Sequence, residues 1–549
     1  MADKCGTETS HRTLVSFIWS VADLLRGDYR QSEYGRVILP LTVLRRLDAV
    51  LAPTKSTVLA TKAANEGKYA NLGPMLRRAA EQPFYNDFPL DFRGLLADPA
   101  NVATNLRTYI GSFSGGAADV LEKFGFDAQI GRLADANLLY QVLARFADLD
   151  LHPRAVSNRR MGYVFEELIR RFSEMSNETA GEHFTPREVI RLMVTLLLAE
   201  DREALTVPGV VRTLYDCACG TGGMLSVADE LLSDPEHGLN PRARLEVFGQ
   251  ELNGETYAIC RSDMMLKGQS PEHIIYGNSF SVDGHADRRF DYLLTNPPFG
   301  VEWKKVEKAV RDEAARGHAG RFGAGLPRIN DGSLLFLQHM LSKFKPVDEG
   351  GSRLAIVFNG SPLFTGAAGS GESEIRRWVL ENDLLEGIVA LPDQLFYNTG
   401  ISTYFWILSN RKRPELVGKV VLLDARDQFV KMRKSLGDKR KEISQEQIAF
   451  VSQLYGDAVD VAASPGHAEH GRVKVLRTTD FGYRRITVER PLRLRFEVTD
   501  EAIETLQESR PFKALAAPPR TAGADAIDAV HQGEKRQALL VEALHACRG

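Results

Sequence analysis

A glycine-rich turn between a strand-like run and a helical run constrains the fold of this chain more than any other feature. The run 210–215 is rich in β-branched and apolar residues, the turn 216–223 contains three glycines, and helical character follows at 226–232. Glycine lets a ligand approach the backbone closely, and the start of the helix presents free N–H groups. The segment therefore predicts an α/β sheet with a ligand site at the carboxyl end of a strand.

The residues of this turn indicate which kind of ligand it holds. The turn lacks the spacing of the dinucleotide fingerprint and the Lys-Ser/Thr ending of a phosphate-binding loop. A ligand that lies beside the turn without a pyrophosphate fits better, and S-adenosylmethionine is the obvious candidate. The alternative is a glycine turn that only packs a helix against the sheet.

Two further strand-like runs end in polar residues. Glu251 follows the run 245–250, at the place where nucleotide-binding α/β sheets usually hold ribose hydroxyls, although a solvated strand-end charge is the simpler alternative. The run 273–276 leads into Gly277-Asn278-Ser279-Phe280, which could place polar groups against the adenine of the cofactor. Short loops of this composition are also common without any ligand.

A fourth strand-like run, 290–295, continues directly into Asn296-Pro297-Pro298-Phe299. The prolines fix φ and make the turn rigid. The Asn296 side-chain oxygen and the Pro297 carbonyl could accept the two N–H bonds of an exocyclic base amine, while Phe299 stacks on the ring. Such an amine has a delocalised lone pair, so it needs acceptors that orient it towards an electrophilic methyl group. The alternative is an ordinary Asn-Pro-Pro turn.

Patterns along the chain predict three parts. Residues 1–155 are expected to be helical, with apolar stripes at 14–25, 37–47 and 138–146 and a loop-rich stretch at 52–103. Residues 156–475 alternate strands with helices, which predicts a doubly wound, Rossmann-like α/β sheet. Residues 476–549 look extended at first and then helical, with apolar residues between Ile527 and Leu544. This tail is expected to dock on another subunit, and intramolecular packing is the alternative.

Composition fits an enzyme of the cytoplasm. The chain has 549 residues, no uninterrupted apolar run that would span a bilayer, and no signal-peptide pattern at its start. Its five cysteines are too scattered for a disulfide framework, and the Cys217–Cys219 pair lacks partners for a metal site, so no metal is expected. The formal charge of −3 is unusual for a protein that binds DNA without a partner. If the chain acts on DNA, this charge indicates that a partner supplies many of the DNA contacts.

Two segments are rich in basic residues despite the negative net charge of the chain. The glycine-rich segment 304–328 follows the Asn-Pro-Pro-Phe turn, and it is expected either to close over a flipped base and touch phosphates or to be a disordered surface loop. The cluster 431–441 holds six cations between acidic residues, which favours a solvated surface.

With these segments in order, the chain resembles the modification (methyltransferase) subunits of type I restriction-modification systems, a branch of the DNA adenine-N6 methyltransferases. The resemblance covers most of the chain. The matching segments are 18–27, 34–40, 44–47, 181–187, 216–225, 296–299, 375–377, 391–401 and 481–485. Two positions depart from the pattern, since Cys217 stands where proline is frequent and Asn278 where many adenine methyltransferases carry aspartate.

The resemblance implies a doubly wound methyltransferase sheet with an N-terminal helical domain, S-adenosylmethionine as cofactor, and DNA as substrate. It implies a catalytic loop formed by Asn296, Pro297, Pro298 and Phe299. It further implies a separate specificity subunit that binds two copies of this chain, and a translocating nuclease subunit that joins them. The expected cofactor contacts are Glu182, His183, Phe184, Thr185, Pro186, Arg187, Asp216, Ala218, Gly220, Thr221, Gly222, Gly223, Glu251, Asn278 and Ser279.

Two other functions are compatible with the same turn. Asn-Pro-Pro-aromatic turns also serve enzymes that methylate a protein glutamine amide or an RNA base amine, because all of these present a planar nitrogen. Such enzymes would not need the helical N-terminal part or the tail. A catalytically silent subunit would keep the fold and lose its affinity for the cofactor.

Overall fold

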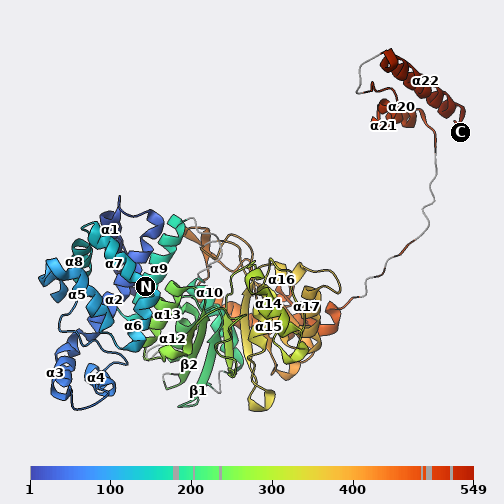
Figure 1. Cartoon of the computed structure of the whole chain (residues 1–549). Coiled ribbons are helices and arrows are strands. Elements are labelled where there is room, and N and C mark those ends of the chain that lie inside the picture. Colours follow the sequence, from blue (N-terminus) through green and yellow to red (C-terminus); the bar gives the residue numbers. More distant parts are fainter. Residues whose placement is uncertain are drawn as a thin grey trace. The chain divides into compact units, whose positions relative to one another are not determined.

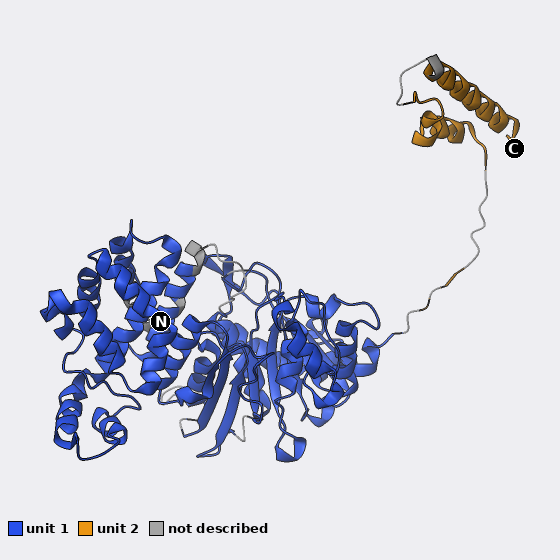
Figure 2. Cartoon of the chain, viewed as in Figure 1, with its two compact units in different colours: residues 1–483 blue, residues 484–549 orange. Residues whose placement is uncertain are grey.

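The computed structural model describes residues 2–176, 185–201, 205–233, 238–240, 242–397, 399–483, 486, 488–489, 497–519 and 524–548. The chain divides into two compact units, Met1–Tyr483 and Arg484–Gly549, which Figure 2 shows in different colours. The predicted cofactor contacts Glu182, His183 and Phe184 lie outside the described residues.

A nine-stranded sheet organises the described part of the first unit, in the order β11-β8-β6-β7-β5-β4-β1-β2-β3. Neighbouring strands from β3 to β5 pair in parallel, whereas β7 runs antiparallel between β5 and β6. The strands are β1 (Val211–Asp216), β2 (Arg244–Glu251), β3 (Ile274–Tyr276), β4 (Tyr292–Thr295), β5 (Arg353–Phe358), β6 (Leu385–Ala390), β7 (Tyr404–Ser409), β8 (Lys419–Asp424) and β11 (Val473–Arg477). The doubly wound α/β sheet predicted from the sequence is confirmed.

Both faces of this sheet are buried, because alternate residues of its strands point into two different cores. Tyr292 and Leu294 of β4 face one core and Leu293 faces the other. The first core is covered by α10 (Arg187–Leu198), α12 (Gly223–Ser233), α18 (Gln445–Gly456) and α19 (Ala458–Ala463). The second is covered by α14 (Glu307–Ala314), α15 (Ser333–Leu341) and α17 (Gly371–Glu381), with the short α16 (Ser361–Phe364) nearby (Figure 1).

The N-terminal helices share a core with the sheet region. Their hydrophobic cluster includes Ala258, Ile259 and Met265 of α13 (Gly254–Leu266). Buried Arg46 donates to the Val156 carbonyl at 2.7 Å, which ties this part to the start of α9. The helices are α1 (Ala2–Leu25), α2 (Gly35–Leu51), α3 (Lys55–Asn65), α4 (Gly73–Ala80), α5 (Val102–Gly111), α6 (Gly115–Lys123), α7 (Phe126–Asp135), α8 (Leu139–Ala147) and α9 (Asn158–Ser176). The prediction of a loop-rich stretch at 52–103 is wrong where α3 and α4 form.

The second unit consists of helices in its described residues. They are α20 (Asp500–Glu508), α21 (Arg510–Ala514) and α22 (Ala524–Ala546). Ile503 and Phe512 are buried, and the Gln537 side chain donates to the Phe512 carbonyl at 2.6 Å, so α22 packs on α21. Ile527 and Leu539 of α22 remain exposed. None of the described helices in either unit combines the length and the apolar character needed to cross a membrane.

Candidate active site

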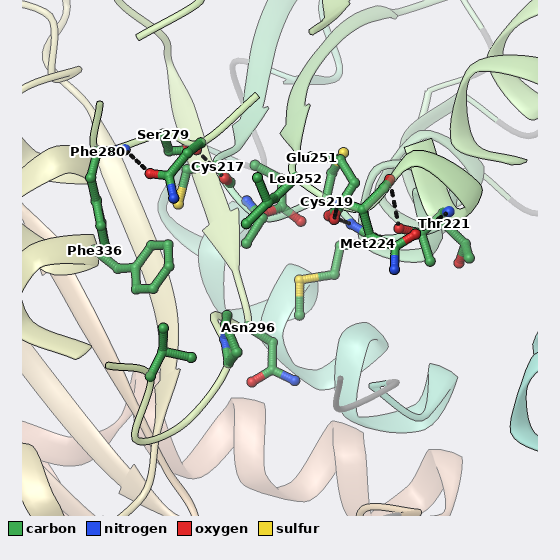
Figure 3. A pocket seen from close by; sticks show the side chains of 18 of the residues that line it. Cys217, Cys219, Thr221, Met224, Glu251, Leu252, Ser279, Phe280, Asn296 and Phe336 are labelled. Carbon is green, nitrogen blue, oxygen red and sulfur yellow. Dashed lines mark hydrogen bonds between the residues drawn. The ribbon is translucent and has the colours of Figure 1, made fainter. Parts of the chain in front are cut away.

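A cavity of about 640 Å³ opens at the carboxyl ends of β1, β2 and β4 (Figure 3). This is the edge at which the winding of the sheet reverses, because β1 lies between β2 and β4. Eleven of the predicted site residues line it: Thr185, Asp216, Ala218, Gly220, Thr221, Gly223, Glu251, Asn278, Ser279, Asn296 and Pro298. The separate motifs of the sequence thus meet in one site.

Glu251 is held by the backbone at the end of β2. Its Oε2 accepts from the Gly220 N–H at 2.8 Å, and its Oε1 accepts from the Asn253 N–H at 2.7 Å. The carboxylate therefore joins the glycine turn to the start of α13, which rules out a freely solvated strand-end charge. Each carboxylate oxygen has two lone pairs, so Glu251 can also accept from the hydroxyls of a ribose.

The glycine turn shapes the wall of the cavity between β1 and α12. Gly220 has φ 54° and Gly222 has φ 81°, a region that favours glycine. A Cβ on Gly222 would lie only 2.7 Å from the Cys260 Sγ, so this glycine is needed for packing rather than for lining the cavity. Cys217, Cys219 and Cys260 are buried free thiols, and no cluster suited to a metal ion occurs among the described residues.

Asp216 lies at the end of β1 and lines the cavity although it is almost fully buried. Its Oδ1 accepts from the Thr295 hydroxyl at 2.6 Å and from the Ala218 N–H at 3.0 Å. Burial raises the pKa of Asp216 to about 7 despite these bonds, and the nearby Glu251 charge adds to the effect. A cationic group in the cavity would stabilise the ionised form, which makes this side chain a fitting partner for a sulfonium cofactor.

Binding of S-adenosylmethionine is therefore expected to weaken as the pH falls below about 7. Below its raised pKa Asp216 is protonated, and the cationic cofactor loses a counter-charge. The loss should approach tenfold in Kd for each pH unit. Calorimetric titration between pH 5.5 and 8.5 measures it, and Asp216→Asn should flatten the profile. A wild-type profile without this slope would contradict the assignment.

Asn296 directly follows β4, and Glu251 ends β2. These two strands lie on opposite sides of β1 in the sheet, and both residues line the cavity. Its Nδ2 donates to the Thr185 hydroxyl at 2.8 Å, which fixes the plane of the amide and hence the direction of Oδ1. Thr185 and Pro186 come directly before α10. Figure 3 shows the side chains of Asn296, Met224 and Glu251 around the same cavity.

Besides Gly222, four other predicted site residues do not line the cavity. Pro297 is buried, and Phe299 packs against the core on the α10 side of the sheet. Pro186 caps α10, and the Arg187 guanidinium lies 4.0 Å from the centre of the Tyr163 ring. Arg187 also faces Glu230 at 3.6 Å, so in this structure it joins α9, α10 and α12 beneath the site.

Several aromatic side chains that sequence patterns did not single out line the cavity. They are Phe280, Trp303, Phe336 and Tyr397. Trp303 is fixed by its indole N–H, which donates to the Arg328 carbonyl at 2.9 Å. Tyr397 belongs to the segment 391–401 that carries part of the resemblance, and this was the one available signal for it. Flat rings around a cavity suit a base or nucleoside.

The basic segment 304–328 is folded and is not a disordered surface loop. It contains α14, and Arg311 pairs with Glu307 within that helix at 2.7 Å. Arg321 is largely buried: it pairs with Glu313 at 2.6 Å and donates to the Ser279 carbonyl at 2.6 Å. Arg321 therefore supports the loop that lines the cavity and does not reach out to phosphates.

Comparison with known proteins gives two family matches. The profile of the N-6 DNA methylase family matches residues 156–483, and that of the HsdM N-terminal domain matches residues 14–146. The chain is 25% identical over 450 residues to the type I restriction enzyme MjaIX methylase subunit of Methanocaldococcus jannaschii, covering 78% of this chain and 75% of the relative. It is 29% identical over 268 residues to the HindI methylase subunit of Haemophilus influenzae, covering 48% of this chain and 54% of the relative.

Solved structures share the fold. A type I restriction-modification methyltransferase subunit from Streptococcus thermophilus superposes with a TM-score of 0.65 at 21% identity, covering 86% of this chain and 96% of that one. A modification subunit of a type I restriction enzyme from Vibrio vulnificus gives a TM-score of 0.55 at 19% identity, covering 86% and 93%. The chain therefore shares its fold with these type I methyltransferase and modification subunits. Because the N-6 DNA methylase profile spans more than half of its residues, this chain belongs to the N-6 DNA methylase family.

Proposed function

We propose that this chain is the modification subunit of a type I restriction-modification complex and methylates N6 of an adenine in DNA. One observation carries the proposal. Asn296, with its amide oriented by Thr185, lies in the same cavity as the glycine turn and Glu251. An amine acceptor and a nucleoside-binding wall thus face one enclosed space, as transfer from S-adenosylmethionine to a flipped base requires.

The chain's contribution to the reaction is orientation. S-adenosylmethionine supplies an electrophilic methyl group on its sulfonium sulfur. The Asn296 Oδ1 and the Pro297 carbonyl accept the two N–H bonds of the adenine amine, which turns the nitrogen lone pair towards that methyl group. With that cofactor bound, its methyl group would be transferred directly to the amine nitrogen, and the proton released from the amine would pass to solvent. No covalent intermediate with the enzyme is needed. Phe299 packs against the core on the α10 side in this structure, so its stacking on the base stays a prediction, whereas Trp303 and Phe336 line the cavity and present aromatic rings to it.

The cofactor contacts follow from the residues that line the cavity. Glu251 would hold the ribose, Asp216 would face the cationic end, and the loop with Asn278 and Ser279 would contact the adenine. Ser279 is buried, and its hydroxyl donates to the Cys217 carbonyl at 2.6 Å, so this loop is fixed against the end of β1. Thr185 and the glycine turn would complete the site.

Complex formation is part of the same proposal. Relatives in this comparison are named as methylase subunits of type I restriction enzymes, which supports a place in a multi-subunit complex. In the proposed complex, a separate specificity subunit binds two copies of this chain and a nuclease subunit joins them. The formal charge of −3 agrees with a complex in which other subunits supply part of the DNA contacts. We assign residues 1–155 to a helical domain, 156–475 to catalysis, and 476–549 to a tail for subunit contact, using the apolar side chains that α22 exposes.

Modification-sensitive sequencing tests this function. DNA from methylation-free cells that express the chain with its neighbouring genes should carry N6-methyladenine at one recurrent motif. An Asn296→Ala version should leave the same sites unmodified. Unmodified DNA in both samples would redirect attention to a protein glutamine amide, an RNA base amine or a silent subunit, and cofactor titration would identify the last of these.

A further inference from the structure

A two-stranded hairpin stands apart from the main sheet. It is formed by β9 (Val430–Leu436) and β10 (Lys439–Glu442), which pair with each other in a sheet of their own. Lys431 lies directly opposite Lys441 in the ladder. Like charges opposite each other destabilise a strand pair, so the hairpin keeps its cations at a cost to its own stability.

Two lysines and the backbone of β10 attach the hairpin to the active site. Lys439 is buried, forms an ion pair with Glu188 of α10, and donates to the Leu395 carbonyl at 3.1 Å. Lys441 forms an ion pair with Asp393. The N–H of Arg440 donates to the Gln394 carbonyl at 2.9 Å. These bonds hold β10 against the segment that follows β6.

This attachment reaches two parts of the cavity. The Asp438 N–H donates to the carbonyl of Tyr397, which lines the cavity, at 2.8 Å. Glu188, the partner of Lys439, lies in the first turn of α10, just after Thr185, which orients Asn296. The hairpin is therefore a fixed element beside the catalytic cavity.

Four further cations of the hairpin point to solvent. Lys431, Arg433, Lys434 and Arg440 are exposed, and no ion pair between described residues includes them. The acidic residues before the hairpin are occupied elsewhere, because Asp424 pairs with Arg426 and Asp427 pairs with Arg472. The solvated surface that the sequence favours is therefore present, because these four side chains are exposed. Their positive charges are not offset by ion pairs between described residues, and the hairpin itself carries only two acidic residues, Asp438 and Glu442.

We propose that the hairpin 430–442 binds the phosphate backbone of the DNA duplex that flanks the target base. The inference rests on the proposed function and names the contact that function requires. Extruding a base costs pairing and stacking energy, so the enzyme must hold the backbone next to the cavity. Two of the four cations, Arg433 and Arg440, are arginines, which suit phosphate because their guanidinium groups can donate two parallel hydrogen bonds.

The test uses the complex purified after co-expression of the chain with its neighbouring genes. In the variant, Lys431, Arg433, Lys434 and Arg440 are all replaced by alanine. Dissociation constants for a DNA duplex that contains the methylated motif are measured between 50 and 200 mM salt, together with the Kd for S-adenosylmethionine. The control variant is Arg288→Ala with Arg289→Ala, two exposed cations that precede β4 and so lie at the end of the sheet remote from the cavity.

The hairpin variant should bind DNA about 10²-fold more weakly, and the magnitude of the slope of log K against log salt should fall by up to about 3.6, since each of the four lost phosphate contacts removes roughly 0.9. The affinity of the hairpin variant for S-adenosylmethionine should match that of the wild type. The control variant should match the wild type in DNA affinity, in salt slope and in affinity for S-adenosylmethionine. Wild-type DNA affinity and slope in a variant that still binds cofactor would overturn the inference. So would loss of a partner subunit with an unchanged slope, because the hairpin would then bind protein. Absence of DNA methylation by the wild-type complex would instead refute the proposed function.

Discussion

Asn296→Ala should lower the rate of methyl transfer to DNA by about 10³-fold, the scale seen when one positioned hydrogen-bonding group is removed from an active site. The alanine removes an acceptor for the amine and the bond to Thr185, whose hydroxyl lies 2.8 Å from the Asn296 Nδ2. Binding of S-adenosylmethionine should remain close to wild type, because Glu251, Asp216 and the glycine turn are unchanged. Single-turnover kinetics and calorimetric titration separate the two effects.

Thr185→Val is the matched control for that variant. It keeps the shape of the side chain and the Asn296 acceptor, but it removes the bond that orients the amide. The transfer rate should fall by roughly fivefold, in line with about 1 kcal/mol for one hydrogen bond. Turnover at the wild-type rate in Asn296→Ala would remove Asn296 from the mechanism.

Glu251→Gln should weaken the binding of S-adenosylmethionine by about 30-fold, equivalent to about 2 kcal/mol for hydrogen bonds to a charged group. In wild type both carboxylate oxygens accept from backbone N–H groups, of Gly220 and of Asn253. The amide NH₂ of glutamine would face one of these donors, so the glycine turn or the start of α13 must shift. The rate at saturating cofactor should change much less than the Kd.

Glu246→Gln provides the comparison, because Glu246 lies on the same strand and pairs with the exposed Arg244 at 3.1 Å. An exposed pair of this kind contributes little, so cofactor affinity should stay at the wild-type value. Equal affinities in both variants would show that Glu251 does not hold the cofactor.

The sheet and the centre of the site were predictable because their signals are local. The apolar run 290–295 and the run 210–215 correspond to β4 and β1 within two residues. Carboxyl ends of parallel strands meet at one edge of a sheet, so Asp216, Glu251 and Asn296 were expected to converge. Thr185-Pro186 precedes α10, as is common where a helix begins. In each case the residue type and its position after a strand or before a helix carry the information.

The remaining features depend on contacts between distant parts of the chain. The strand β9 alternates apolar and charged residues only over its first four positions, and β10 has no apolar residue, so the pattern is too short to identify either strand. Arg321 looks like a phosphate contact in the sequence, yet it is buried against Glu313 and the Ser279 carbonyl. The sequence also did not predict that α13 packs into the core of the N-terminal helices as well as against the sheet. Helical periodicity shows which face of a helix is buried, but not which neighbour it contacts.

Mass spectrometry of DNA nucleosides after reaction with methyl-deuterated S-adenosylmethionine tests the central claim most directly. The complex containing this chain, incubated with unmethylated DNA, should place the deuterated methyl group on N6 of adenine, and the Asn296→Ala complex should place none. Label on the N4 amine or on carbon 5 of cytosine, or label recovered in RNA or protein while adenine stays unlabelled, would contradict the account.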